Sequence, residues 1–125
     1  MRLLLDTQAL LWWLFDLPQL RASAREAITN PNNQVHVSAV SAIEIATKQA
    51  IGKLDAPTDL EQQVADNWFL PLPVTIGHGL AVRDLPLHHR DLFDRLLVAQ
   101  ARCESLTLVT PDRRLSEYDV QVLST

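Results

Sequence analysis

Short apolar runs recur along the chain, separated by longer stretches in which apolar residues have helical spacing. A short apolar run bounded by turn residues is typical of a buried strand, whereas apolar residues three or four positions apart form one face of a helix. The runs predict strands at 2–5, 35–37, 72–75, 107–110 and 120–123. The helical spacing predicts helices at 7–15, 20–29, 41–52, 59–68, 76–85 and 91–104, with a loop or short helix at 111–117.

The order of these elements predicts the fold class. Strands alternate with helices along the chain, and parallel strands need crossover connections, which are usually helical and right-handed. We therefore expect an α/β protein with a central, mainly parallel sheet of four to five strands. In such sheets functional groups gather at the carboxyl ends of the strands.

Residues at the predicted helix ends are consistent with these boundaries. Ser38 or Ser41 can accept a backbone N–H at the start of the third helix, Thr58 can do so for the fourth, and Asp91 for the last. Gly52 tolerates the left-handed backbone that often ends a helix, so it is the expected end of the third helix.

Length and composition predict one globular domain over residues 1–125, because a chain of this size buries about two-thirds of its surface in one core. Asp6 interrupts the apolar N-terminal stretch after three leucines. We therefore expect this stretch to be neither a signal peptide nor a membrane span. The single cysteine, Cys103, cannot form an internal disulfide, and we expect it to be a buried thiol. A cytoplasmic protein is expected on these grounds.

Acidic residues stand at four positions where the apolar pattern makes a carboxylate unusual. Asp6 and Asp112 each follow a predicted strand, where either one can simply cap the next helix. Glu44 lies inside a mainly apolar helix, and burying it without a partner is costly unless it points outward. Asp94 lies in the first turn of an apolar helix, where the helix dipole also favours an acid.

Two acids at strand ends and two near the starts of helices can converge on one edge of the sheet. Clustered carboxylates repel one another unless a cation joins them, and hard oxygen ligands select Mg²⁺ or Mn²⁺. One or two such ions support phosphodiester hydrolysis, because they activate water and stabilise the leaving oxygen. We predict catalytic and metal-binding roles for the same four residues: Asp6, Glu44, Asp94 and Asp112.

The net charge of −4 argues against a nucleic-acid binder until these acids are set aside, which leaves 11 basic and 11 acidic residues. Six of the 11 basic residues lie between positions 83 and 114, where any one of them can equally be part of a solvated helix face. The candidates for RNA backbone contacts are Arg90, Arg95, Arg113 and Arg114.

Four segments of the sequence resemble PIN-domain proteins of the VapC toxin group in order and spacing: LLLDTQALLWWL, VSAVSAIEIATKQAIGKL, HHRDLFDRLLVAQA and LTLVTPDRRL. The resemblance implies a PIN-like α/β/α sandwich and a metal-dependent endoribonuclease. It further implies a homodimer and a VapB-like antitoxin, one segment of which fills the groove beside the acids.

The same resemblance matches individual residues. The four acids named above correspond to the acids of the family, and Thr7 and Thr110 correspond to hydroxyl positions that often flank the site. Asp91 is an accessory candidate, ranked first as a helix cap. The chain has Leu92 where family members commonly have Pro, and Pro111 where they often have a small or amide residue, which can change how Asp112 is aimed.

Two other functions are possible for a chain with this pattern. A phosphoryl-accepting receiver domain has a similar size, but it needs adjacent acids after the first strand and a lysine ending a late strand, whereas this chain has Thr7 and Thr110 there. A catalytically silent PIN-like binding module is the other alternative, against which the complete set of acids argues. The histidines lack zinc-site spacing with the cysteine, and the tryptophans are expected in core or partner-interface packing rather than in base stacking.

Overall fold

The computed structural model describes residues 1–88 and 91–125, and within them the chain forms a five-stranded, all-parallel sheet in the order β3-β2-β1-β4-β5. The strands are β1 (Arg2–Leu5), β2 (Gln34–Ser38), β3 (Leu70–Leu72), β4 (Thr107–Thr110) and β5 (Val122–Ser124). The α-helices are α1 (Thr7–Leu14), α2 (Ala22–Thr29), α3 (Ala39–Ala50), α4 (Leu60–Asp66), α5 (Ile76–Ala81) and α6 (Leu92–Glu104). Two 3₁₀ helices, η1 (Val82–Asp84) and η2 (Arg113–Glu117), complete the described elements.

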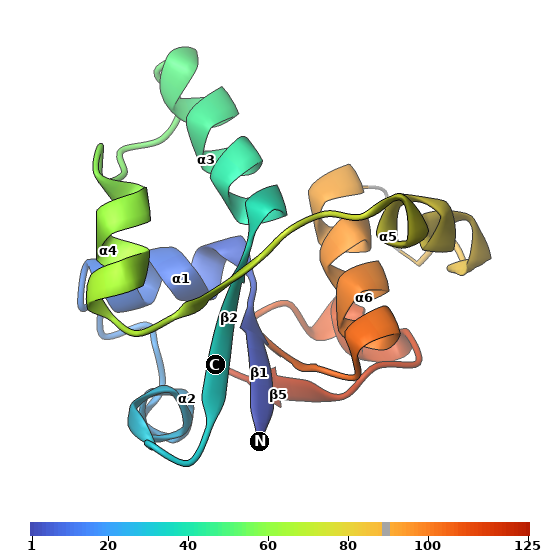
Figure 1. Ribbon diagram of the computed structural model, residues 1–125, viewed down its shortest axis with the longest axis horizontal. Helices are drawn as coiled ribbons and strands as arrows, with labels where there is room; N and C mark the ends of the chain where they lie inside the picture. Colours follow the sequence, from blue (N-terminus) through green and yellow to red (C-terminus); the bar gives the residue numbers. More distant parts are fainter. Residues whose placement is uncertain (89–90) are drawn as a thin grey trace.

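The sheet is covered on both faces, as its leucine-rich central strand requires. Successive side chains of a strand point to opposite faces, so Leu3 and Leu5 pack with α1 and α2, whereas Leu4 packs with Leu97 and Val98 of α6. In Figure 1, α1, α2 and α4 lie on one side of the sheet, α5 and α6 lie on the other, and α3 rises beyond the carboxyl end of β2. The expected α/β/α sandwich with a parallel sheet is confirmed.

Most expected elements are present with small shifts at their ends. β3 begins at Leu70 and ends at Leu72, earlier than the expected 72–75. Pro73 cannot donate a hydrogen bond to a neighbouring strand, so the strand ends before it. Prolines in sheets are confined to edge strands, and β3 is such a strand. The helix expected at 76–85 is divided into α5 and η1, and β5 begins at Val122 rather than at residue 120.

Several expectations about single side chains are wrong. Asp59, not Thr58, occupies the N-cap of α4, and its side chain makes no capping bond. Cys103 is exposed rather than buried. Trp68 has a left-handed backbone, with φ of 60°, and is 90% exposed, so it lies outside the core, and partner-interface packing stays a prediction for it.

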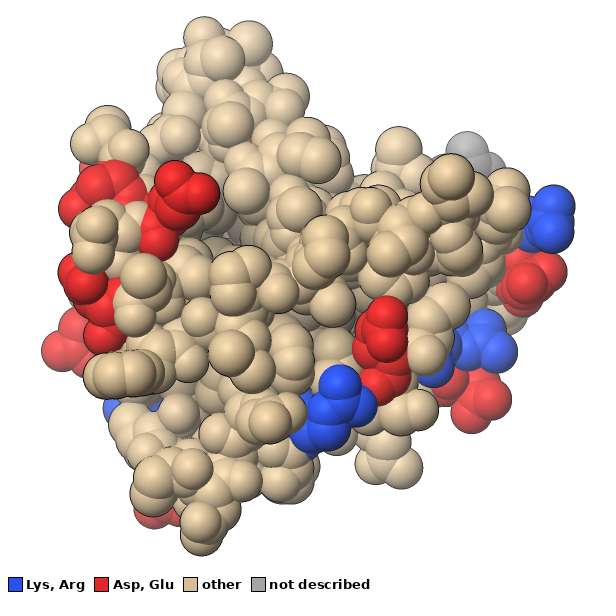
Figure 2. All heavy atoms as spheres, in the orientation of Figure 1, with Lys and Arg blue, Asp and Glu red and all other residues tan. Residues whose placement is uncertain are grey.

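An uncharged surface follows the chain from β3 into α5. Four apolar side chains of this segment are exposed: Leu70, Val74, Ile76 and Leu80. The face shown in Figure 2 is correspondingly poor in charge across its centre, with acidic side chains gathered at one side near α4. None of the helices in the described part of the chain is both long and apolar enough to cross a membrane.

Ser38 joins the sheet to α3 and helps to hold α3 against α6. Its hydroxyl accepts the backbone N–H of Val40 at 2.9 Å, which caps α3, and donates to the buried Oε1 of Gln100 in α6. Ser38→Ala removes both bonds and leaves a buried amide oxygen without its donor. We expect a loss of about 2 kcal/mol in the free energy of unfolding, measured by urea denaturation.

The matched control for this prediction is Ser23→Ala, which changes an exposed serine on α2. It is expected to alter the free energy of unfolding by less than about 0.5 kcal/mol. An equal effect of the two substitutions would show that Ser38 does not anchor α3.

Candidate active site

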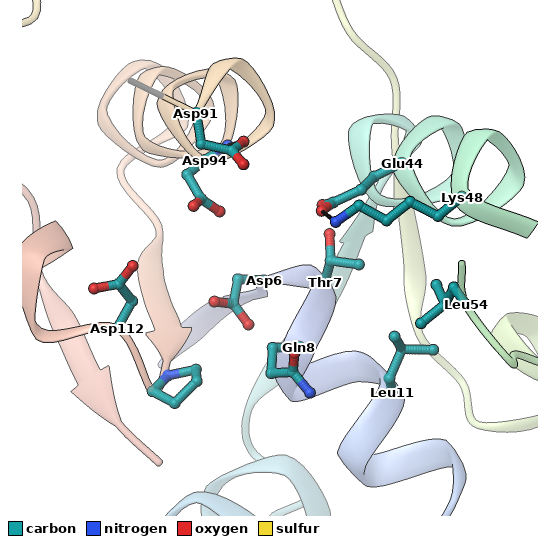
Figure 3. Close-up of a pocket in the computed structure, with 11 residues that line it drawn as sticks. Asp6, Thr7, Gln8, Leu11, Glu44, Lys48, Leu54, Asp91, Asp94 and Asp112 are labelled. Atoms are coloured by element: carbon teal, nitrogen blue, oxygen red, sulfur yellow. Dashed lines mark hydrogen bonds and ion pairs between the residues drawn. The ribbon is translucent and has the colours of Figure 1, made fainter. Parts of the chain in front are cut away.

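A cleft with a volume of about 350 Å³ opens at the carboxyl end of the parallel sheet. The four predicted acids, Asp6, Glu44, Asp94 and Asp112, all line it, and we call them the cleft acids. Figure 3 shows them projecting toward a shared space from the end of β1, from α3, from the start of α6 and from the segment after β4. The cleft is also lined by Thr7, Gln8, Leu11, Lys48, Leu54, Asp91 and Pro111.

Asp6 lies at the base of the cleft and is only 4% exposed. Its backbone N–H continues the sheet by donating to Val109 at 3.0 Å, and its Oδ1 accepts the N–H of Ala9 at 2.7 Å. Asp6 is therefore the N-cap of α1 as well as a cleft acid, so the two alternatives from the sequence are compatible.

Burial raises the pKa of Asp6 from 3.8 to about 7. Hydrogen bonds from the Thr110 hydroxyl and the Ala9 N–H oppose this rise in pKa, whereas the negative charges of Asp94 and Glu44 add to it. A cation in the cleft would favour the ionised carboxylate, because an opposite charge lowers the pKa of an acid.

Glu44 is 7% exposed, so the alternative in which it points away from the protein is wrong. Its Oε2 accepts a hydrogen bond from Nζ of Lys48, one helical turn later, at 2.6 Å. Its Oε1 is buried and has no hydrogen-bond partner among the described residues. A buried carboxylate oxygen without a partner is energetically costly, which makes it a natural ligand atom for a cation.

Two acids stand at the start of α6. Asp91 is the N-cap, and its Oδ1 accepts the backbone N–H of Asp94 at 3.1 Å, as the sequence predicts. Both line the cleft, so Asp91 is close enough to take part in the site in addition to its capping role.

Asp112 caps η2 and is held by Arg114. Its Oδ1 accepts from the backbone N–H of Arg114 at 3.0 Å and from Nε at 3.1 Å, and its Oδ2 accepts from Nη2 at 2.9 Å. The Asp112 side chain is 23% exposed, in contrast to the buried Asp6.

The two predicted hydroxyl residues, Thr7 and Thr110, are buried beside the acids. Thr7 donates from Oγ1 to Oγ of Ser41 at 3.0 Å, which connects α1 to α3. Oγ1 of Thr110 accepts the N–H of Asp112 at 3.0 Å, and the same hydroxyl lowers the pKa of Asp6. These hydroxyl groups connect the segments that carry the acids.

The four arginines predicted to contact RNA differ in their surroundings. The guanidinium of Arg95 donates to the carbonyl oxygens of Pro86, Val82 and Leu85, at 3.0, 3.1 and 3.3 Å. Arg95 therefore supports the loop before α6, a use that differs from the expected backbone contact with RNA. Arg113 and Arg114 are exposed next to Asp112, and Arg90 lies outside the described residues.

Lys48 also lines the cleft, and it is not among the site residues predicted from the sequence. The signal for it was present, because a Glu and a Lys four residues apart lie on the same side of a helix. The hydrogen bond to Glu44 raises the pKa of Lys48, so the ammonium group of Lys48 stays charged.

The residues of the cleft match a divalent metal ion in the type of donor atom that they supply. They supply the hard oxygen donors that Mg²⁺ and Mn²⁺ prefer, together with one buried oxygen that lacks a partner. Within residues 1–88 and 91–125, however, no three His, Cys, Asp or Glu side chains gather closely enough to hold one ion. The donor set therefore fits in type and charge, and binding requires the acids to approach one another.

Comparison with known proteins identifies the domain and its fold. The model of the PIN domain matches residues 3–121. The fold is similar to VapBC2 from Rickettsia felis bound to a DNA fragment from their promoter, with a TM-score of 0.74, 15% identity and coverage of 100% of this chain and 99% of that chain. It is also similar to VapBC-1 from nontypeable Haemophilus influenzae, with a TM-score of 0.65, 17% identity and coverage of 99% and 98%.

A third similar structure is FitAcB from Neisseria gonorrhoeae, with a TM-score of 0.65, 20% identity and coverage of 98% of this chain and 96% of that chain. A search of curated protein sequences gives no match. The structural likeness at these identities concerns the fold, and it confirms the fold expected from the resemblance to VapC proteins. Because the PIN-domain match spans nearly all of the sequence, the chain belongs to the PIN-domain family.

Proposed function

We propose that this protein is a Mg²⁺- or Mn²⁺-dependent endoribonuclease. PIN domains are typically nucleases. The observation that carries the proposal is the convergence of the cleft acids from four separate segments on one cleft. Mutual repulsion makes such a grouping costly unless a cation is bound.

The cleft acids are the proposed ligands for one or two ions, with Asp91 as an accessory acid. When bound, such an ion supplies an activated water for attack on phosphorus and stabilises the leaving oxygen. The chain's own contribution is to fix the carboxylates. Capping of α1 holds Asp6 in position, the ion pair with Lys48 holds Glu44, and Arg114 holds Asp112.

RNA is proposed to enter along the rim formed by η2. Arg113 and Arg114 are exposed there and supply positive charge for the phosphate backbone, and Arg90 is retained from the sequence as a third candidate. We leave Arg95 out of this set because its side chain is partly buried against the loop before α6, whereas Arg113 and Arg114 are exposed.

The proposed biological role is that of the toxin in a toxin–antitoxin pair in the cytoplasm. The similar structures are of VapBC and FitAB complexes, and a VapB-like antitoxin and a second copy of the chain are the proposed partners. The exposed apolar side chains between β3 and α5 support association with another protein, because contiguous apolar surface often marks an interface.

A catalytically silent PIN-like binding module is the second candidate. It is favoured by the pairing of Glu44 with Lys48 and of Asp112 with Arg114, since these cations already neutralise two of the cleft acids. The receiver-domain alternative is set aside because the chain belongs to the PIN family.

Removal of divalent ions separates the two candidates. Chelator-treated protein is expected to lose RNA cleavage by at least about a hundredfold, and added Mg²⁺ or Mn²⁺ is expected to restore it. The assay is cleavage of end-labelled single-stranded RNA on a denaturing gel, with 5′-phosphate and 3′-hydroxyl product ends expected. Cleavage at the full rate after chelation contradicts the metal-dependent mechanism, and no cleavage with either ion favours the silent module.

A further inference from the structure

Lys48 is the cationic side chain that enters the cleft from α3. Its Nζ lies 2.6 Å from Oε2 of Glu44, and the two residues are four positions apart on the same helix. The Lys48 side chain is 44% exposed, whereas that of Glu44 is 9% exposed. The ion pair, drawn in Figure 3, therefore joins a buried carboxylate to a partly exposed ammonium group.

The contact with Lys48 makes the two oxygens of Glu44 unequal. Oε2 is engaged by Nζ, whereas the buried Oε1 has no hydrogen-bond partner within the described structure. The second ion pair of the cleft is different, because Arg114 donates to both Oδ1 and Oδ2 of Asp112. Lys48 therefore contacts one carboxylate oxygen of Glu44 and leaves the other available. Arg114, in contrast, contacts both carboxylate oxygens of Asp112.

We propose, on the basis of the metal-dependent function proposed above, that Lys48 is a positioning residue. It fixes the Glu44 carboxylate through Oε2 and leaves Oε1 as the ligand atom for the divalent cation. Residues that hydrogen-bond a metal ligand fix its orientation, and their loss weakens metal binding by about 10-fold to 100-fold. Lys48 would act through Glu44 without touching the ion or the RNA.

The direction in which metal affinity changes when Lys48 is replaced distinguishes a positioning role from a purely electrostatic one. A lysine in the cleft repels a divalent cation, so electrostatics alone predicts that loss of its charge strengthens cation binding. A lysine that orients a ligand has the opposite effect when it is removed. Metal affinity therefore separates the two roles without reference to RNA cleavage.

The experiment is calorimetric titration of the purified, metal-free full-length chain with Mn²⁺. Lys48→Met, which removes the charge but keeps an aliphatic side chain, is expected to raise the Kd for Mn²⁺ at least about tenfold. Lys48→Arg keeps a cationic donor at this position and is expected to restore the Kd to within about threefold of the wild type.

A control variant removes a cation outside the cleft. Lys53→Met changes an exposed lysine beyond the end of α3 and is expected to change the Kd by less than about twofold. Circular dichroism establishes that each variant is folded, and Lys48→Gln replaces Lys48→Met if the latter unfolds, with the same weakening expected.

The outcomes separate this inference from the proposed function. Unchanged or tighter Mn²⁺ binding by Lys48→Met overturns the positioning role. Tight Mn²⁺ binding by a wild-type protein that does not cut RNA contradicts the nuclease proposal and leaves the role of Lys48 intact. Failure of the wild type to bind Mn²⁺ overturns both.

Discussion

Replacing Asp6 by Asn is expected to reduce RNA cleavage by at least about a thousandfold. Asp6 is the most buried of the cleft acids, and the negative charges of Asp94 and Glu44 act on it directly. Asn keeps the shape of the side chain and is a good N-cap, so α1 remains capped. The substitution therefore removes the charge needed to bind a cation and little else. The measurement is the single-turnover rate of cleavage in saturating Mn²⁺.

The control is Asp119→Asn, which removes an exposed acid outside the cleft. It is expected to cleave RNA at a rate within about twofold of the wild type. If the protein acts as a toxin, Asp6→Asn also relieves the growth arrest caused by expression of the wild type. Undiminished cleavage by Asp6→Asn would remove Asp6 from the mechanism.

The stability of the metal-free protein is expected to depend on pH through Asp6. Its pKa is 3.8 in the unfolded chain and about 7 in the folded one, so the folded state holds this proton more tightly. The stability that Asp6 contributes is therefore complete below about pH 4 and is lost as the pH rises to about 7. At about 1.4 kcal/mol per pH unit, the loss is on the order of 4 kcal/mol.

Asp6→Asn isolates this contribution, because the other titrating groups are present in both proteins. We expect the variant to gain stability relative to the wild type, by up to about 4 kcal/mol, between pH 4 and pH 8. The free energy of unfolding is measured by urea denaturation in the presence of a chelator. A difference between the two proteins that is constant across this range contradicts the raised pKa of Asp6.

The parts of the site that follow from periodicity were predictable from the sequence. Asp6 and Asp112 each follow a short apolar strand, and neighbouring parallel strands end at the same edge of a sheet. Glu44 and Asp94 were identified because acids are unusual within apolar helices, and both line the cleft. Glu44 is therefore predictable from one physical rule, which is that an isolated charge avoids an apolar environment.

The remaining features depend on tertiary contacts that a single sequence does not display. The use of Arg95 by the carbonyls of Pro86, Val82 and Leu85 depends on how the preceding loop folds over α6. The pairing of Lys48 with one oxygen of Glu44 depends on side-chain rotamers. Local composition likewise gave no sign that Trp68 and Cys103 are exposed.

The most direct measurement is the anomalous diffraction of crystals grown with Mn²⁺. The expected result is a manganese peak inside the cleft, about 2 Å from carboxylate oxygens of Asp6 and Asp94, with Oε1 of Glu44 turned toward it. A well-ordered cleft that contains no manganese at a saturating concentration, or manganese bound only elsewhere on the protein, would contradict the account.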